Sequence, residues 1–498
     1  MTAGQLTLVI VCCLAVLSIG AAVSIVTGRK VDSQEGWHVA GRSLPLWVAV
    51  LTQFATAVGG GVLVAHVGNS YQNGWAYWFY PFFVFTGFLL LSFIARWLRD
   101  QEFTTIPEIL RSVYAYHPVV IVLAALAAIV VPFGWLATQY VAFASLFSEI
   151  TGVSTVVLTI IMALITLVFV LPGGLRSVAY SDAILAGLML VFSAVVVIYA
   201  VNMADGWSGI TANVPSELTS FPQGLAAAGG MTVLLWAFSI LPGTLTNQMY
   251  FQRVFALGDV NKARLVMILG GILVFIGSLY PFLLGLSVRA LNDGMTDDPE
   301  AASGWFLTQL PIGLLALFAS FLLITIATTT SSALQSVVTN VVQDITVSVF
   351  GYKNRDTRSI SRIIAVLVVI LGAVLAIAFP AALAWLVATY AYSASILFAP
   401  IFLGYFLSRQ GGRLRSGTAI ISMLGGLVVC AGAHILGTTI PYAIFGIASS
   451  VVCLLVAHAV FGRVDSDADG AAAQPATPST APTQPGQPGG AVPSQEVL

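Results

Sequence analysis

Residues 51–68 read LTQFATAVGGGVLVAHVG, an apolar stretch with three consecutive glycines, starting at Gly59, near its middle. Residues 234–253 read LLWAFSILPGTLTNQMYFQR, a second apolar stretch that Pro242 and Gly243 interrupt at its middle. Each lies in a window long enough to cross a bilayer, which takes roughly 20 apolar residues of helix. Glycine and proline also occur in ordinary membrane helices as packing or kink residues. Their matched placement nevertheless predicts two membrane helices that are broken near their centres.

The composition of the whole chain is that of a membrane protein. Of its 498 residues, 58% are hydrophobic and 8% are charged, with a mean hydropathy of +0.96, whereas soluble domains carry about 25% charged residues. The four cysteines lie inside apolar runs, which excludes a secreted disulfide scaffold. The 19 basic and 20 acidic residues leave a net charge of −1 without a basic cluster, so we expect no nucleic-acid partner.

Thirteen apolar windows predict an all-α, polytopic membrane protein with about 13 transmembrane helices in a lipid bilayer. The windows are 5–27, 45–72, 75–98, 117–147, 154–172, 177–201, 224–250, 264–288, 312–343, 360–379, 382–407, 416–438 and 440–462. The first window could be a signal peptide. However, residues 1–7 carry no Lys or Arg and Arg29 and Lys30 follow the apolar run, the reverse of the secretory pattern, so we expect this helix to stay in the mature protein.

The distribution of positive charge predicts the orientation in the membrane. With thirteen alternating spans, eighteen of the 19 Lys and Arg residues fall on one side and Arg289 falls alone on the other. Cytoplasmic loops are enriched in Lys and Arg. We therefore expect a multi-pass protein of the plasma (inner) membrane with its N-terminus outside and its C-terminus in the cytoplasm. On this count a substrate carboxylate would meet no arginine at mid-membrane.

The two predicted breaks lie five spans apart, an odd offset, so the two halves would have opposite topologies. This predicts a first helix with a cytoplasmic loop over 1–44, a first inverted repeat over 45–201, a second over 224–407, and two C-terminal transmembrane helices over 416–463. Residues 464–498 are rich in Ala, Pro, Gln, Thr and Gly and contain no aromatic residue. Such a segment cannot bury apolar surface, so we expect a disordered cytoplasmic tail, which is either a plain terminus or a docking segment.

An unwound stretch leaves backbone carbonyls without helical partners at a depth where lipid cannot satisfy them. A sodium ion fits this need, because it is a hard cation that takes oxygen ligands. Residues 324–344, ITIATTTSSALQSVVTNVVQD, supply further oxygens from five consecutive hydroxyl residues, Thr328 to Ser332. One helical face carries Thr325, Thr328, Thr329, Ser332, Ser336 and Thr339. A single Ser or Thr usually bonds to its own helix backbone, but a run of this length favours coordination of an ion.

Asp182 is the only carboxylate within a predicted span that lies away from the charge clusters at the span ends. A bare carboxylate in hydrocarbon costs several kcal/mol, so Asp182 should face the bundle and have a partner. Two readings stay open: a structural pair with Arg176, or a cation ligand or attractor on the exit path.

Four stretches together resemble the sodium/solute symporter family, which includes bacterial proline, pantothenate, sialic acid and galactose carriers. They are AGRSLPLWVAVLTQFATAVGGG with NSYQNGW, LPGGLRSVAYSDAI, TNQMYFQRVFA and IATTTSSALQSVVTNVVQDI, spread over residues 40–345. The resemblance implies a five-plus-five inverted-repeat (LeuT-like) core inside the thirteen-span topology.

The resemblance also implies a sodium site between the second and ninth spans. Its ligands map to the backbone carbonyls of Ala55, Val58 and Thr325 and to the hydroxyls of Thr328 and Thr329. Where many members have Ala-x-x-Ser-Ser/Thr, this chain has Thr-x-x-Thr-Thr, which keeps both hydroxyls.

Some members of the family bind a second sodium ion, and the resemblance maps this position to Asp182, Thr328, Ser331 and Ser332. All four side chains offer oxygen ligands. The sequence therefore leaves open whether one or two sodium ions bind in each transport cycle.

The solute is less constrained than the ion. Sugar-transporting relatives place a glutamine and a glutamate where this chain has Val62 and Pro81, which argues against a sugar. The scarcity of charge in the spans leaves small neutral, zwitterionic or weakly anionic organic solutes. Candidate substrate-binding residues are Gln53, His66, Gln139, Trp236 and Tyr390. His66 could sense protons or could simply be satisfied by helix packing, and Gln139 could instead join two helices.

We therefore predict a sodium-coupled secondary active symporter that imports a small organic solute by alternating access. The alternatives are a proton-coupled carrier of the same fold, suggested by His66 and Asp182, and a solute-binding membrane sensor without net transport. We expect no enzyme, because the chain has no HExxH or GxSxG motif and no second intramembrane aspartate. No cofactor is expected beyond Na⁺ as the coupling ion. The solute and the oligomeric state stay open.

Overall fold

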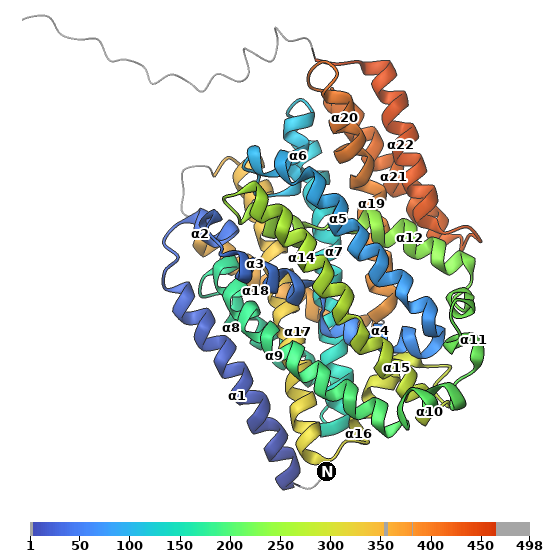
Figure 1. Ribbon diagram of the computed structural model, residues 1–498. Helices are drawn as coiled ribbons and strands as arrows, with labels where there is room; N and C mark the ends of the chain where they lie inside the picture. Colours follow the sequence, from blue (N-terminus) through green and yellow to red (C-terminus); the bar gives the residue numbers. More distant parts are fainter. Residues whose placement is uncertain (1–2, 353–356, 381, 465–498) are drawn as a thin grey trace, which may run out of the picture.

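The computed structural model describes residues 3–352, 357–380 and 382–464 (Figure 1). Over this part the chain forms helices joined by short loops, with two isolated β-bridges at Leu414. The described part contains 10 candidate membrane spans by length and composition. The predicted all-α class is confirmed. The predicted tail lies outside the described residues, except for Val464.

Each of the thirteen predicted windows contains a helix or a pair of helices. Ten windows contain one main helix: α1 (Ala3–Gly28), α5 (Phe79–Asp100), α7 (Pro118–Thr151), α8 (Thr155–Val170), α9 (Gly174–Met203), α17 (Ile312–Asn340), α18 (Arg358–Ala378), α19 (Ala382–Phe398), α21 (Ser416–Ile435) and α22 (Tyr442–Phe461). Three are split into pairs: α3 (Leu46–Ala57) with α4 (Gly60–Asn73), α12 (Gly230–Thr244) with α13 (Gln248–Phe255), and α14 (Val260–Gly277) with α15 (Leu279–Leu291).

Shorter elements connect or extend these helices. The connecting helices are α2 (Gln34–Val39), α6 (Ile106–Val113), α10 (Gly206–Asn213), α11 (Ser216–Thr219) and α16 (Ala302–Thr308), with 3₁₀ turns η1 (Ala40–Arg42), η2 (Gly74–Trp78), η3 (Gln223–Ala226) and η4 (Pro299–Ala301). The π-helix η5 (Val341–Val349) extends α17, and the π-helix η6 (Ala399–Leu403) joins α19 to α20 (Gly404–Ser408). At one edge of the bundle α21 and α22 pack on each other and on α19, far from α1 (Figure 1).

The break in the second window is confirmed at the glycines. The helix α3 ends at Ala57, Val58 leaves the helical region at φ −108° and ψ 83°, and α4 begins at Gly60. The glycines allow α17 to approach the broken backbone closely. A Cβ atom on Gly60 would lie 1.9 Å from Cγ1 of Ile326 on α17, a distance that no packed side chain tolerates.

The second break exists, but its predicted position was wrong. Pro242 and Gly243 lie inside α12, which continues to Thr244, and the chain leaves the helix only before α13. The position is set instead by Asn247, whose side-chain oxygen accepts a hydrogen bond from the Met249 backbone N–H at 3.0 Å and caps α13. A third break, which the sequence analysis did not predict, separates α14 from α15 at Ser278.

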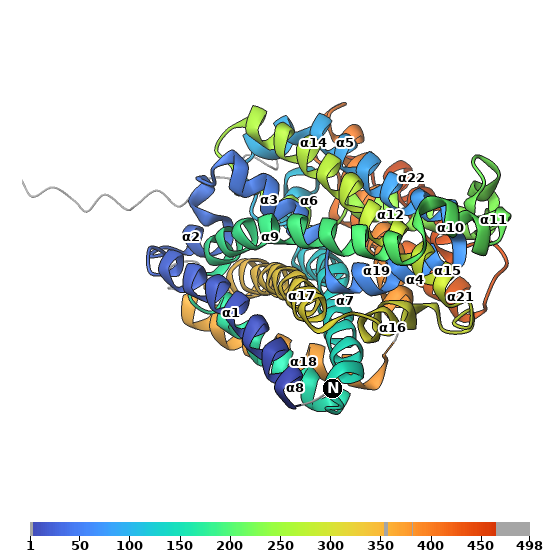
Figure 2. The same cartoon turned by 60° about the horizontal axis from the view of Figure 1, so that its bottom comes forward.

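The helix α17 is the central element of the bundle. Every residue from Phe318 to Asn340 is buried, whereas a helix at a protein surface buries only one stripe. Its neighbours include α1, α7, α9 and α18, which surround it when the molecule is viewed closer to the bundle axis (Figure 2). The hydroxyl-rich stretch of α17 therefore finds its hydrogen-bond partners inside the protein.

The close approach at Gly60 gives a stability prediction. Gly60→Ala should lower the free energy of unfolding by about 1–3 kcal/mol, because the new methyl group overlaps the Ile326 side chain. The cost of Ile326→Ala should be smaller in the Gly60→Ala variant than in the wild type, because the truncation relieves the overlap. Thermal melting in detergent measures both effects.

The matched control is Gly187→Ala in α9, where an added Cβ meets nothing within 4 Å. Its melting temperature should equal or slightly exceed that of the wild type, because alanine favours helix. Equal melting of Gly60→Ala and Gly187→Ala would contradict the close packing of α4 on α17.

Candidate functional site

The break between α3 and α4 faces the hydroxyl run of α17. The Thr329 hydroxyl donates a hydrogen bond to the Ala55 carbonyl at 2.8 Å, and the Thr328 hydroxyl donates to the Thr325 carbonyl at 3.0 Å. These four residues are fully buried, and Val58 is 8% exposed. The structure thus brings Ala55, Thr325, Thr328 and Thr329 together, with Val58 in the break beside them. Each hydroxyl oxygen has two lone pairs, so rotation of the two hydroxyls would turn oxygen towards a cation.

On the α3 side of this break, Asp182 of α9 lies in a buried polar cluster. Its Oδ2 atom accepts hydrogen bonds from the hydroxyls of Thr52 at 2.8 Å and Ser332 at 3.0 Å. The Arg253 guanidinium of α13 lies 3.8 Å from the same oxygen and also donates a hydrogen bond to Ser332. All four side chains are fully buried. The ion pair therefore joins α9 to α13, and its hydrogen bonds to Ser332 join both helices to α17 in the interior of the bundle.

This cluster corrects one reading of Asp182. The arginine beside Asp182 is Arg253 and not Arg176, whose guanidinium lies over the Tyr180 ring at 5.9 Å. Arg253 was counted among the charges of the cytoplasmic side, and its side chain is fully buried beside the partner carboxylate.

The residues of the predicted second sodium position are only partly brought together. Ser332 contacts Asp182 directly. The Ser331 hydroxyl donates to the Ala327 carbonyl at 2.6 Å, and the Thr328 hydroxyl also bonds to the backbone of its own helix. Asp182 Oδ1 has no hydrogen-bond partner among the described residues. One carboxylate oxygen therefore remains available in this cluster.

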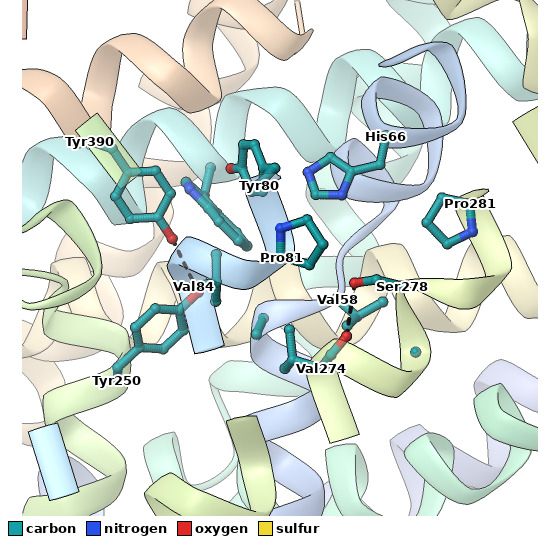
Figure 3. Close-up of a pocket in the computed structure, with 13 residues that line it drawn as sticks. Val58, His66, Tyr80, Pro81, Val84, Tyr250, Val274, Ser278, Pro281 and Tyr390 are labelled. Carbon is teal, nitrogen blue, oxygen red and sulfur yellow. Dashed lines mark hydrogen bonds between the residues drawn. The ribbon is translucent and has the colours of Figure 1, made fainter. Parts of the chain in front are cut away.

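A narrow cavity lies beside the break and is shown in Figure 3. Its volume is about 20 Å³, room for about one water molecule. Its lining comprises Ala57, Val58, His66, Tyr80, Pro81, Val84, Trp135, Tyr250, Val274, Gly277, Ser278, Pro281 and Tyr390. None of these 13 residues carries a carboxylate, an ammonium or a guanidinium group.

The five predicted substrate residues divide into three groups. His66 and Tyr390 line the cavity. Gln139 lies next to the break, where its side-chain oxygen accepts a hydrogen bond from the Gly61 backbone N–H at 3.1 Å. Gln53 and Trp236 are buried in α3 and α12 and are not among the lining residues.

The sequence analysis missed three aromatic lining residues, Tyr80, Trp135 and Tyr250. The Tyr250 hydroxyl lies 3.1 Å from the Tyr390 hydroxyl, within hydrogen-bond distance. A signal for Trp135 was present, because it precedes Gln139 by four residues and so shares its helix face. Tyr80 directly precedes Pro81, the position that was compared with a substrate-binding glutamate.

A second polar network closes the side of the bundle that the charge distribution predicts to be cytoplasmic. The Gln252 amide donates to the His38 carbonyl at 2.9 Å and to the Thr339 hydroxyl at 3.0 Å, and Ser336 donates to Gln252 at 2.8 Å. The Gln335 amide donates to the Trp37 carbonyl at 3.0 Å. These contacts join the connecting helix α2 to α13 and α17.

His38 in α2 takes part in this closure as a neutral side chain. Its Nδ1 atom lies 3.1 Å from the Thr339 hydroxyl. Burial lowers the pKa of His38 to about 3, because desolvation disfavours the charged imidazolium. The network therefore keeps its charge state from about pH 5 to pH 8.

Comparisons with known proteins agree on the family and the fold. A sequence model of the sodium:solute symporter family matches residues 37–426. Relatives include Solute carrier family 5 member 4 of Rattus norvegicus, 25% identical over 222 residues, and Sodium/myo-inositol cotransporter 2 of Bos taurus, 26% identical over 233 residues. These matches cover 44% and 46% of this chain but only 33% and 34% of the relatives, so the matched region spans about a third of their length.

Among solved structures, the substrate-bound outward-open state of a Na⁺-coupled sialic acid symporter is similar, with a TM-score of 0.77 and 16% sequence identity. The match covers 92% of this chain and 98% of the other. The predicted LeuT-like fold is confirmed by this likeness.

The buried pair gives a second prediction. Asp182→Asn should destabilise the protein by about 3–5 kcal/mol, because Arg253 would remain buried without a counter-charge. The double variant Asp182→Asn/Arg253→Gln should be more stable than the single variant. Thermal melting in detergent compares them, and a double variant as unstable as the sum of its single variants would contradict a direct pair.

Proposed function

Because the chain belongs to the sodium:solute symporter family, we propose that it is a sodium-coupled symporter that imports a small organic solute by alternating access. The observation that carries this proposal is the contact between the broken backbone of α3 and α4 and the Thr329 hydroxyl. It joins main-chain oxygen and hydroxyl oxygen from two different helices at one buried point.

The proposed sodium ligands are the carbonyls of Ala55, Val58 and Thr325 and the hydroxyls of Thr328 and Thr329. All five groups are neutral oxygens, which suits a monovalent hard cation better than a site with several carboxylates would. When sodium binds, the hydrogen bond from Thr329 to Ala55 gives way to two ion–oxygen contacts. The ion then ties the break to α17, and its release frees α3 and α4 to move relative to α17.

The second proposed cation position, at Asp182, Thr328, Ser331 and Ser332, already has a positive group beside it. The Arg253 guanidinium lies 3.8 Å from Asp182, and another ion would compete with it for the same carboxylate. We therefore propose one sodium ion per cycle, with Arg253 acting as the resident cation of the second position.

Alternating access is supported by unequal closure of the two sides. The network of His38, Gln252 and Thr339 closes the side predicted to be cytoplasmic. A cavity of about 760 Å³ lies at the other side, with Glu149 and Glu300 among its lining residues. Since the cavity at the break holds about 20 Å³, a solute needs its walls to separate. We assign this movement to the two proposed inverted repeats, 45–201 and 224–407.

The lining also bears on the solute. The neutral walls favour the predicted small neutral, zwitterionic or weakly anionic solutes, and Pro81 stands in the lining where sugar carriers of the family place a glutamate.

In the proposed orientation the N-terminus is outside the plasma membrane. A proton-coupled carrier and a sensor without transport are the alternatives that the experiments below discriminate.

The hydroxyl of Thr329 gives a direct test of the sodium site. Thr329→Val removes one oxygen while keeping the side-chain shape, so the sodium concentration for half-maximal thermal stabilisation should rise by about 10-fold or more. Sodium-dependent thermal stabilisation of the purified protein provides the measurement without knowledge of the solute.

Thr330→Val is the matched control, because the Thr330 hydroxyl bonds to the Ile326 carbonyl of its own helix. Its sodium dependence should match that of the wild type. Equal sodium dependence of the Thr329 and Thr330 variants would exclude Thr329 as a ligand.

Replacing sodium tests the coupling ion itself. In proteoliposomes, a panel of radiolabelled solutes should accumulate with an inward sodium gradient and should stop accumulating when choline replaces sodium. A proton gradient alone should drive no uptake. Uptake driven by protons in sodium-free buffer would instead establish the proton-coupled alternative, and sodium-dependent binding without uptake would favour the sensor.

A further inference from the structure

Three hydrogen-bonding atoms in the cavity at the break have no partner among the described residues: His66 Nε2, Tyr80 OH and Trp135 Nε1. All three side chains are almost completely buried. A buried polar group without a partner costs on the order of 1–3 kcal/mol. Three such atoms around one small cavity therefore indicate a binding site for a ligand that forms hydrogen bonds with them.

Each of the three atoms can donate a hydrogen bond. Trp135 Nε1 can only donate, and the phenolic hydroxyl of Tyr80 carries one donor hydrogen. The Tyr77 hydroxyl lies 3.4 Å from His66 Nδ1, and when it donates to that nitrogen the neutral ring carries its hydrogen on Nε2. Two of the rings lie close together, since the centroids of His66 and Tyr80 are 4.3 Å apart (Figure 3).

The other polar groups of the lining already have partners. The Tyr250 and Tyr390 hydroxyls lie within hydrogen-bond distance of each other, and the Ser278 hydroxyl donates to the Val274 carbonyl at 2.8 Å. The Gly61 backbone N–H at the start of α4 is taken by Gln139. An acceptor group on a solute in this cavity would find the three side-chain donors free.

The charges near the cavity indicate the charge of the solute. Asp182 and Arg253 neutralise each other, so a sodium ion at Ala55 and Val58 would add one uncompensated positive charge to a buried region. A buried unpaired charge is costly. A solute with one negative charge removes this cost, whereas a second negative charge or an ammonium group would restore it.

We propose that the solute is a small monocarboxylate with an apolar body. This inference rests on the proposed sodium symport. The carboxylate accepts hydrogen bonds from His66 Nε2, Tyr80 OH and Trp135 Nε1 and faces the bound sodium. The apolar body lies against Pro81, Val84 and the neighbouring aliphatic wall once the cavity opens.

The test uses the purified full chain in proteoliposomes with radiolabelled pyruvate and butyrate, compared with succinate, alanine, choline and myo-inositol. Protein-free liposomes measure passive entry of the acids. A sodium gradient should drive uptake of the two monocarboxylates only. Because one cation and one anion move together, an imposed membrane potential should leave the initial rate unchanged.

The donor atoms are tested by Trp135→Phe and Tyr80→Phe. Tyr80→Phe removes the hydroxyl and keeps the ring, and Trp135→Phe replaces the indole and its N–H by a smaller aromatic ring. Each should raise the KM for the monocarboxylate by about 10-fold to 100-fold, while sodium-dependent thermal stabilisation stays intact as proof of folding. Tyr140→Phe is the matched control, because Tyr140 is also on α7 but lies near Gly372 of α18 and does not line the cavity. Its KM should be unchanged.

The outcomes separate the two proposals. Sodium-driven uptake of alanine, choline or myo-inositol without monocarboxylate uptake would overturn the inference and leave symport standing. Monocarboxylate uptake that continues when choline replaces sodium would keep the inference and overturn sodium coupling. Unchanged KM values in both donor variants would also overturn the inference.

Discussion

Where a helix is interrupted inside a membrane protein, the backbone N–H and C=O groups that lose their helical hydrogen bonds need partners from the protein, because lipid provides no hydrogen-bonding groups. In this chain the constraint acts at Val58 and Gly59, where α3 ends and α4 has not begun. The structure meets it with α17, whose Thr329 hydroxyl bonds to the Ala55 carbonyl. The bare backbone at Gly60 allows the contact, since any side chain there would push α17 away. The central position of α17 and the location of the proposed ion site both follow from this one requirement.

The hydroxyls of α17 fall into two groups according to their hydrogen-bond partners. Thr328, Thr330 and Ser331 donate to carbonyls of their own helix, which is the usual arrangement for isolated hydroxyls in membrane helices. Thr329 and Ser332 instead reach other elements, Ala55 and Asp182. The run is therefore divided between residues that satisfy themselves and residues that join α17 to its neighbours. In the proposed site, an ion held by Thr328 and Thr329 together with the carbonyls of α3 would couple ion binding to movement between helices.

Much of the fold could be predicted because hydrophobic length and glycine placement are local properties. The windows around α1, α7 and α17 follow directly from runs of apolar residues. The second break could not be placed from Pro242, because a helix can continue past a proline when neighbouring groups satisfy the freed carbonyl. The capping bond of Asn247 that ends the unwound stretch depends on the local backbone path, which periodicity does not specify.

The sequence pattern predicted a broken stretch and a hydroxyl run, and the structure places the two in contact. The individual positions Ala55 and Thr329 came from the resemblance to the family, and their role as ion ligands stays a prediction. Tyr80 and Trp135 looked like ordinary apolar packing residues in the sequence, and only the folded structure places both in the same cavity. Partner choice for charges is equally non-local, which is why one reading of the sequence paired Asp182 with Arg176 and not with Arg253.

The pair of Asp182 and Arg253 gives the interior a fixed electrical balance. Each ion alone would cost several kcal/mol when buried, and together they leave the region near neutral. A carrier that moves a cation through such an interior changes this balance by one charge whenever the site fills. Under the proposed symport of a monocarboxylate, an anionic solute bound at the same time returns the interior to neutrality. Obligatory coupling would then follow from electrostatics, because a carrier that holds only the ion or only the solute would bury an unpaired charge.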